Sequence, residues 1–94
     1  MTNFTYSKDL PDNLDLGKVV AIDCETMGLN PGRDRLCVVQ LSSGDGHTHI
    51  VQIENNQTKA HNLERLLKDK NILKLFHFGR FDIAILYSTF GVLS

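Results

Sequence analysis

The sequence predicts an α/β protein with a mixed sheet, in which three antiparallel strands precede a helix, a fourth strand and a second helix. Three β-rich runs between residues 19 and 53 are separated by turn residues. After Thr58 the apolar residues change from strand to helix spacing. The chain has 94 residues, of which 41% are hydrophobic, so we expect a single small domain with one core.

Composition and charge exclude several classes of protein. The ordinary apolar content and a net charge of −1 argue against disorder, and seven Gly and two Pro without a period argue against collagen-like or low-complexity chains. Ten Lys and Arg against eleven Asp and Glu argue against a strongly basic nucleic-acid-binding protein, although a local basic patch is compatible with them.

Location and redox state are also predicted. No apolar run reaches the roughly 18–20 residues of a membrane-spanning helix, and residues 1–8 lack the pattern of a signal peptide, so we expect a cytoplasmic protein without membrane contact. Cys24 and Cys37 are too few for a disulfide framework, so they are predicted to be reduced core thiols.

The first half of the chain supplies the meander. Residues 1–17 are predicted to be an irregular lead-in segment with a short apolar anchor at Phe4 and Tyr6. Asp45 and Gly46 favour a turn before the third strand, which should therefore pair antiparallel with the second. The three strands are predicted at residues 19–25, 36–41 and 47–53.

The second half supplies the helices. Leu63, Leu66 and Leu67 recur at i, i+3 and i+4, which predicts an amphipathic helix over residues 60–69. A short apolar run at 72–76 has the length of a strand. Another helix should start at residue 79 or 80 and end near residue 88, with Gly91 as its stop signal. That second helix has little polar face and should be largely buried.

Two carboxylates end the first strand. Asp23 and Glu25 are two residues apart, so strand alternation places both on one face and Cys24 on the other. Adjacent anions repel each other unless a cation bridges them, and Mg²⁺ or Mn²⁺ prefers oxygen ligands. The alternative interpretation is a pair of exposed acids at a strand end.

Asp82 is the third acid of interest. In one interpretation it complements the dipole at the start of its helix. In the other, the strand over 72–76 runs parallel beside the first strand, which brings Asp82 to the same sheet edge as Asp23 and Glu25. Three convergent carboxylates are compatible with a two-metal site.

These segments resemble a known family. Residues 22–29 (Ile-Asp-Cys-Glu-Thr-Met-Gly-Leu) are similar to the first motif of the Asp-Glu-Asp-Asp 3′-5′ exonucleases, and residues 77–86 are similar to the second, with Asp82 as its acid. The strand Cys37-Val38-Val39-Gln40-Leu41 and the spacing from His77 to Asp82 most resemble the ribonuclease D branch. The resemblance covers residues 19–86 and implies a ribonuclease H-like fold, whose first half matches the predicted element order.

The resemblance also implies a function and the residues that carry it. It implies hydrolysis of terminal phosphodiesters at the 3′ end of single-stranded RNA or DNA with two Mg²⁺ or Mn²⁺ ions. Asp23 would bridge both ions, Glu25 would bind the nucleophile-side ion and Asp82 the other. Contacts with the substrate would come from the side chains or backbone of Thr26, Met27, His77 and Phe81. From the residues alone, His77 either orders the loop before Asp82 or acts as a base.

The chain departs from this family in its length. The third motif, which carries a general base and the fourth acid, would lie past Ser94, so we expect residues 18–94 to be the N-terminal half of an exonuclease domain, truncated before the last parallel strand. The strand at 72–76 should then be an exposed sheet edge, shielded by self-association. We expect weak metal binding and little or no nuclease activity from the chain alone. The alternative is a noncatalytic remnant that binds nucleic acid or a partner protein through that edge.

Other polar side chains leave two interpretations each. His47 and His49 share a strand face, as either a metal-binding pair or two exposed edge-strand histidines. Arg33, Arg35 and Arg80 are either phosphate contacts or solvated loop arginines.

Overall fold

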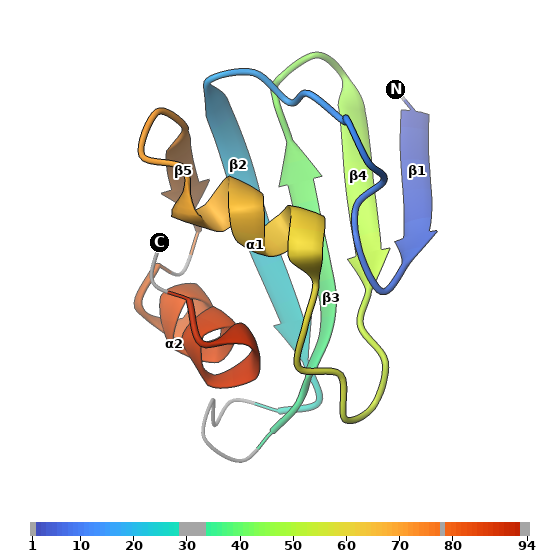
Figure 1. Ribbon diagram of the computed structural model, residues 1–94, viewed down its shortest axis with the longest axis vertical. Helices are drawn as coiled ribbons and strands as arrows, with labels where there is room; N and C mark the ends of the chain where they lie inside the picture. The colour runs from blue at the N-terminus through green and yellow to red at the C-terminus, as the bar shows by residue number, and fades with distance from the viewer. Residues whose placement is uncertain (1, 29–33, 78, 93–94) are drawn as a thin grey trace.

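The computed structural model describes residues 2–28, 34–77 and 79–92, which form a sheet with two helices on one of its faces (Figure 1). Within these residues, no helix has the length and apolar content needed to span a bilayer. The elements in chain order are β1 (Thr2–Ser7), β2 (Val19–Thr26), β3 (Leu36–Ser42), β4 (His47–Gln52), α1 (His61–Lys68), β5 (Leu73–Phe76) and α2 (Gly79–Phe90).

The sheet has the strand order β1-β4-β3-β2-β5. β2, β3 and β4 form the predicted antiparallel meander, with Asp23 opposite Gln40 and Val39 opposite Val51. β5 runs parallel to β2 at one edge of the sheet. This is the arrangement that the second interpretation of Asp82 requires, in which the three acids converge. β5 is also the exposed edge strand that we predicted, since the side chains of Leu73 and Leu75 are 58% and 50% exposed.

The other edge differs from the prediction. Residues 2–7, expected to be irregular, form β1, which pairs parallel with β4. The ring of His49 stacks with Phe4 at 5.2 Å and with Tyr6 at 5.9 Å between ring centroids. The Tyr6 hydroxyl is also hydrogen-bonded to His49 Nδ1 at 2.8 Å. The predicted anchor is therefore a strand, because the i, i+2 spacing of Phe4 and Tyr6 puts both rings on the face that His49 occupies.

β1 also corrects the prediction for the histidine pair. β4 lies inside the sheet rather than at its edge, and His49 is buried, so the two histidines are not exposed edge residues. His47 contacts Phe4 edge-on at 5.6 Å. The pair thus contributes to the packing of β1 on β4.

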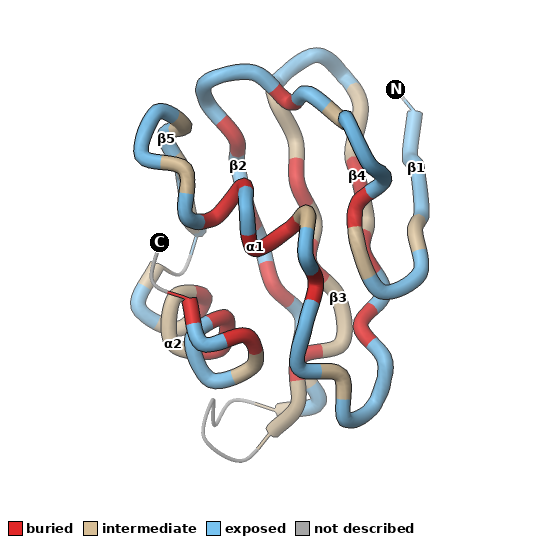
Figure 2. The backbone as a smooth tube through the Cα atoms, in the orientation of Figure 1, coloured by how far each residue is buried: buried red, intermediate tan, exposed pale blue. Residues whose placement is uncertain are grey.

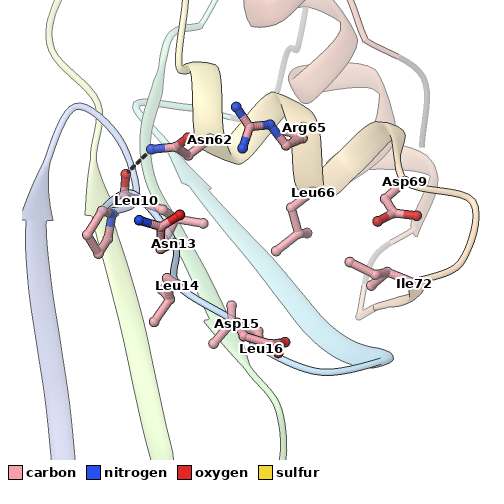
Figure 3. A pocket seen from close by; sticks show the side chains of 11 residues that line it. Leu10, Asn13, Leu14, Asp15, Leu16, Asn62, Arg65, Leu66, Asp69 and Ile72 are labelled. Carbon is pink, nitrogen blue, oxygen red and sulfur yellow. Dashed lines mark hydrogen bonds between the residues drawn. The ribbon is translucent and has the colours of Figure 1, made fainter.

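The segment between β1 and β2 holds the start of α1. The residue before α1, Ala60, has no side chain able to cap the helix. Asp9, which is distant in sequence, caps the helix instead. Its carboxylate accepts hydrogen bonds from the backbone N–H groups of Asn62 and Leu63, both at 2.9 Å. Asn62 Nδ2 in turn donates to the Leu10 carbonyl at 2.9 Å (Figure 3). A cavity of about 350 Å³ remains between this segment and α1.

Both helices cover the same face of the sheet (Figure 1). Buried positions recur along β2, β3 and β4 (Figure 2), and they form one core cluster with the buried residues of α1 and α2. α1 and α2 agree with the predicted helices to within two residues at each end, and Gly91 follows α2 with a φ of +73°, as its predicted role as a stop signal requires. The opposite face carries exposed apolar side chains from β2 and β5, including Val19, Leu73 and Leu75. Among the described residues, no helix covers that face.

Candidate functional site

The end of β2 carries the two paired acids. Val20, Ile22 and Cys24 are buried, whereas Asp23 and Glu25 are exposed. Strand alternation therefore places both carboxylates on the open face of the sheet, as predicted. The pairing with β3 changes register between Glu25 and Thr26, so the strand becomes irregular directly after the second acid.

Asp82 reaches the same end of β2 from the other side of the sheet. It lies in the first turn of α2 and is only 1% exposed. Its carboxylate lies close to the Cys24 thiol, whose pKa it influences. Burial raises the pKa of the Cys24 thiol, and the negative charges of Asp82 and Asp23 raise it further. Cys24 is thus a core thiol that faces away from Asp23 and Glu25, as predicted, but it contacts the third acid.

The three acids consequently share one end of β2 but approach it from different faces. Within residues 2–28, 34–77 and 79–92, no group of three His, Cys, Asp or Glu side chains is placed to hold a metal ion. The donor chemistry of Asp23 and Glu25 nevertheless fits a hard divalent cation, because both offer exposed carboxylate oxygens two residues apart on one strand face.

A groove of about 390 Å³ lies beside Asp23 on the open face. It brings Asp23 together with His77, which follows β5 and is exposed. Leu75 of β5 contributes an apolar wall. Phe81 does not line this groove; it is half-buried and packs against the core.

The groove also contains residues that our sequence analysis did not single out. Gln40, Ser42 and Thr48 line it with polar side chains from β3 and β4. The strand alternation carries a signal for the first two, because polar residues alternate with buried Val39 and Leu41. The alternation does not predict the register between β2 and β3, which places Gln40 opposite Asp23.

The residues after Glu25 form a constrained turn. The Thr26 hydroxyl donates a hydrogen bond to the Gly28 carbonyl, and the Met27 N–H donates to the Arg35 carbonyl at 3.0 Å. The Met27 side chain is 74% exposed. A Cβ atom at Gly28 would overlap the Asp34 carboxylate, so a larger residue there would have to displace that side chain. Met27 is therefore presented to solvent by a turn whose backbone is fixed on both sides.

The three arginines have different positions. The Arg35 guanidinium donates to the Ile53 carbonyl at 3.0 Å and to Cys37 Sγ at 3.2 Å, so it ties the start of β3 to the end of β4. It is therefore neither a solvated loop arginine nor directed at a ligand. Arg80 is exposed in the first turn of α2. Arg33 lies outside the described residues.

Comparisons with known proteins bear on this site. A family model described as 3′-5′ exonuclease matches residues 2–94. Among proteins with curated functions, none matches the chain.

Several solved structures are similar to the chain in both sequence and fold. NrnC from Brucella melitensis is 57% identical, with a TM-score of 0.93 over 99% of this chain, and it has been solved with bound Mg²⁺ and bound to pGG. A structure titled the apo form of the nuclease is 47% identical, with a TM-score of 0.94 over 100% of this chain. Escherichia coli RNase D, an exoribonuclease involved in structured RNA processing, is 25% identical, with a TM-score of 0.64 over 81% of this chain.

These structures are also longer than the chain. It spans 46% of the length of NrnC, 46% of the apo nuclease and 20% of RNase D.

Proposed function

The chain belongs to the 3′-5′ exonuclease family, and on that basis we propose that it supplies the Asp23–Glu25 side of a metal-dependent exonuclease site acting on the 3′ end of single-stranded RNA or DNA. The observation that carries the proposal is the pair of exposed carboxylates at the end of β2, beside a groove on the same face. The similarity to NrnC, which has been solved with Mg²⁺ and with pGG, supports both the cation and the class of substrate.

We propose Asp23 and Glu25 as ligands of Mg²⁺ or Mn²⁺, and Asp82 as a third. For Asp82 this role requires its carboxylate to become accessible to the cation, because it is now buried beside the Cys24 thiol. A bound divalent cation would activate water for attack on the last phosphodiester and stabilise the leaving 3′ oxygen.

Other residues of the chain would hold the substrate. We propose that His77 contacts the terminal nucleotide, because it lines the groove that also contains Asp23. Met27 is exposed directly after the acids on a fixed turn, so its side chain is available to pack against a sugar or base. Thr26 fixes that turn through its hydroxyl. Phe81 supports the first turn of α2, from which Asp82 projects.

The first test measures cation binding by the 94-residue chain. Titration with Mn²⁺, with free Mn²⁺ followed by electron paramagnetic resonance, should show weak binding that Asp23→Asn abolishes. Asp12→Asn is the matched control, because Asp12 is an exposed acid of the segment before β2 and should leave binding unchanged. Equal Mn²⁺ binding by the wild type and by Asp23→Asn would contradict the assignment of the ligands.

A second test measures hydrolysis. We propose that the chain alone has little or no activity, since it spans under half of NrnC. A chimaera in which residues 1–94 replace the matching part of Brucella NrnC should release mononucleotide from 5′-labelled pGG in the presence of Mg²⁺. In that chimaera, Asp23→Asn should lower the rate about a thousandfold, equivalent to roughly 4 kcal/mol of transition-state stabilisation. A folded chimaera whose rate does not depend on Asp23 would refute the proposal.

A further inference from the structure

A cluster of cations on α1 and just before it is not used by the proposed site. Lys59, Arg65 and Lys68 are all exposed, and together they line a concave surface of about 620 Å³. His61 lines the same surface, one turn before Arg65. We call these four residues the α1 basic face.

The two acids at this surface accept hydrogen bonds from backbone N–H groups. Glu64 is 8% exposed, and its carboxylate accepts a hydrogen bond from the Ala60 N–H at 2.8 Å. The Asp69 carboxylate accepts one from the Asn71 N–H at 2.9 Å. Among the described residues, neither acid forms an ion pair with the cations of the α1 basic face. The surface thus carries three exposed cations against two carboxylates, one of which is buried, so positive side chains outnumber negative ones where an external anion would bind.

We propose that the α1 basic face binds the phosphodiester backbone of a single-stranded nucleic acid whose 3′ end lies at the Asp23–Glu25 site. Charge complementarity favours this occupant, because the face concentrates cations in a chain whose net charge is −1. The inference rests on the proposed function, which brings a polyanion to the same domain. Apart from the His61 ring, the lining residues carry no ring on which a base could stack, so the contact would not read sequence.

The geometry of the helix suits successive phosphates. From His61 to Lys68 the helix rises by roughly 10 Å. Successive phosphates of one strand are roughly 3.4 Å or more apart along the axis, so two or three of them fit this length. Arg65 and Lys68 are three residues apart and therefore project from the same side of α1.

The path between the two surfaces sets a minimum length for the ligand. α1 covers the closed face of the sheet, whereas Asp23 and Glu25 lie on the open face, so a strand must pass around the molecule (Figure 1). The shorter extents of the molecule are 24 and 22 Å. That distance corresponds to about seven nucleotides at roughly 3.4 Å each. A dinucleotide can therefore occupy only the site, while a 12-mer can reach both surfaces.

The experiment compares the salt dependence of binding for two lengths of ligand. Fluorescence anisotropy would follow 5′-labelled pGG and a 5′-labelled 12-nucleotide RNA binding to the 94-residue chain in EDTA, between 25 and 150 mM NaCl. Neutralising two phosphate contacts by Arg65→Gln with Lys68→Gln should reduce the slope of log K against log [salt] for the 12-mer by about 1.4, at about 0.7 for each cation. Affinity for the 12-mer should fall about tenfold or more at low salt. pGG is too short to reach the α1 basic face and its own site lacks a cation in EDTA, so it should bind neither the wild type nor the variant measurably.

A double variant with the same loss of charge is the control. Lys8→Gln with Lys18→Gln removes two exposed lysines that lie outside the α1 basic face, and it should leave the slope and the affinity for the 12-mer unchanged. Thermal denaturation checks that both double variants fold, as expected for substitutions of exposed side chains.

Three results would overturn the inference. One is an equal loss in the control variant, and another is a wild-type chain that does not bind the 12-mer at 25 mM NaCl. The third is displacement of the 12-mer by polyglutamate or by anionic phospholipid vesicles at equal charge concentration, which would identify a general polyanion surface.

The binding assay also separates this inference from the proposed function, because no cation is present. If Asp23→Asn leaves Mn²⁺ binding unchanged while the Arg65/Lys68 variant still loses salt dependence, the proposed function fails and binding by the α1 basic face stands. If the converse holds, only the further inference fails.

Discussion

The contact between Asp9 and the start of α1 gives a prediction whose size follows from the structure. Asp9→Ala removes the acceptor of two backbone N–H groups in the first turn of α1, at Asn62 and Leu63. It also removes the bond from the Leu10 N–H at 2.8 Å. Because Ala60 offers no side-chain cap, no other described side chain takes over these helical donors.

The expected cost follows from these contacts. Loss of a capping side chain costs about 1–2 kcal/mol, and loss of a negative charge at a helix N-terminus costs roughly 0.3–1 kcal/mol more. We therefore expect Asp9→Ala to lower the free energy of unfolding by about 2–3 kcal/mol. For a domain of this size, that corresponds to a fall in Tm of about 10–20 °C. Asp9→Asn should cost about half as much, because the amide retains one oxygen acceptor.

Urea denaturation followed by circular dichroism at 222 nm measures this loss. Glu54→Ala is the control, since its ion pair with Lys8 is 3.7 Å long and more than half exposed, and it should cost less than about 0.5 kcal/mol. If Asp9→Ala and Glu54→Ala destabilise the chain equally, Asp9 does not cap α1 and the reasoning is wrong.

Two further predictions concern β1 and the core thiol. Tyr6→Phe keeps the stacked ring but leaves His49 Nδ1 without its hydroxyl partner. Urea denaturation should therefore show that the free energy of unfolding falls by about 1 kcal/mol. Thr5→Ala, on the other face of β1, is the control and should lower it by less than half of that. Because the folded pKa of Cys24 is raised, the unfolded chain releases its thiol proton first, and stability in EDTA should fall as the pH rises above about 8.5, by at most roughly 1.4 kcal/mol per pH unit. Cys24→Ser should flatten this decline, and an unchanged slope would contradict the origin assigned to it.

The sequence was most informative where one face of an element is apolar. The meander, α1 and β5 followed from alternation, leucine spacing and turn residues, because burial of one face selects a single period. β1 was missed because Phe4 and Tyr6 give only two apolar positions, and their partner His49 lies more than forty residues away in the chain. Asp9 was missed for the same reason: its helical partners are distant in sequence, so no local capping pattern exists.

The candidate site was predictable to the extent that strand geometry determines it. The i, i+2 spacing of Asp23 and Glu25 was sufficient to place both on one face, and the parallel pairing of β5 brings Asp82 to the same end of β2. The face from which Asp82 approaches was not predictable. α2 itself carries apolar side chains on nearly all of its sides, so its sequence does not determine which side faces the sheet. Contact with Cys24 then places the acid on the buried side.

The division of the molecule into two faces connects the two proposals. Asp23, Glu25 and the groove beside them lie on the open face, whereas α1 and its cations lie above the closed face. A ligand that depends only on the carboxylates should therefore bind with an affinity that Asp23→Asn changes and Arg65→Gln does not. A longer strand should depend on both residues, and its dependence on Arg65 should appear only above the length needed to pass around the sheet. Measuring affinity against oligonucleotide length from two to twelve nucleotides locates that threshold, which the dimensions of the molecule place at about seven.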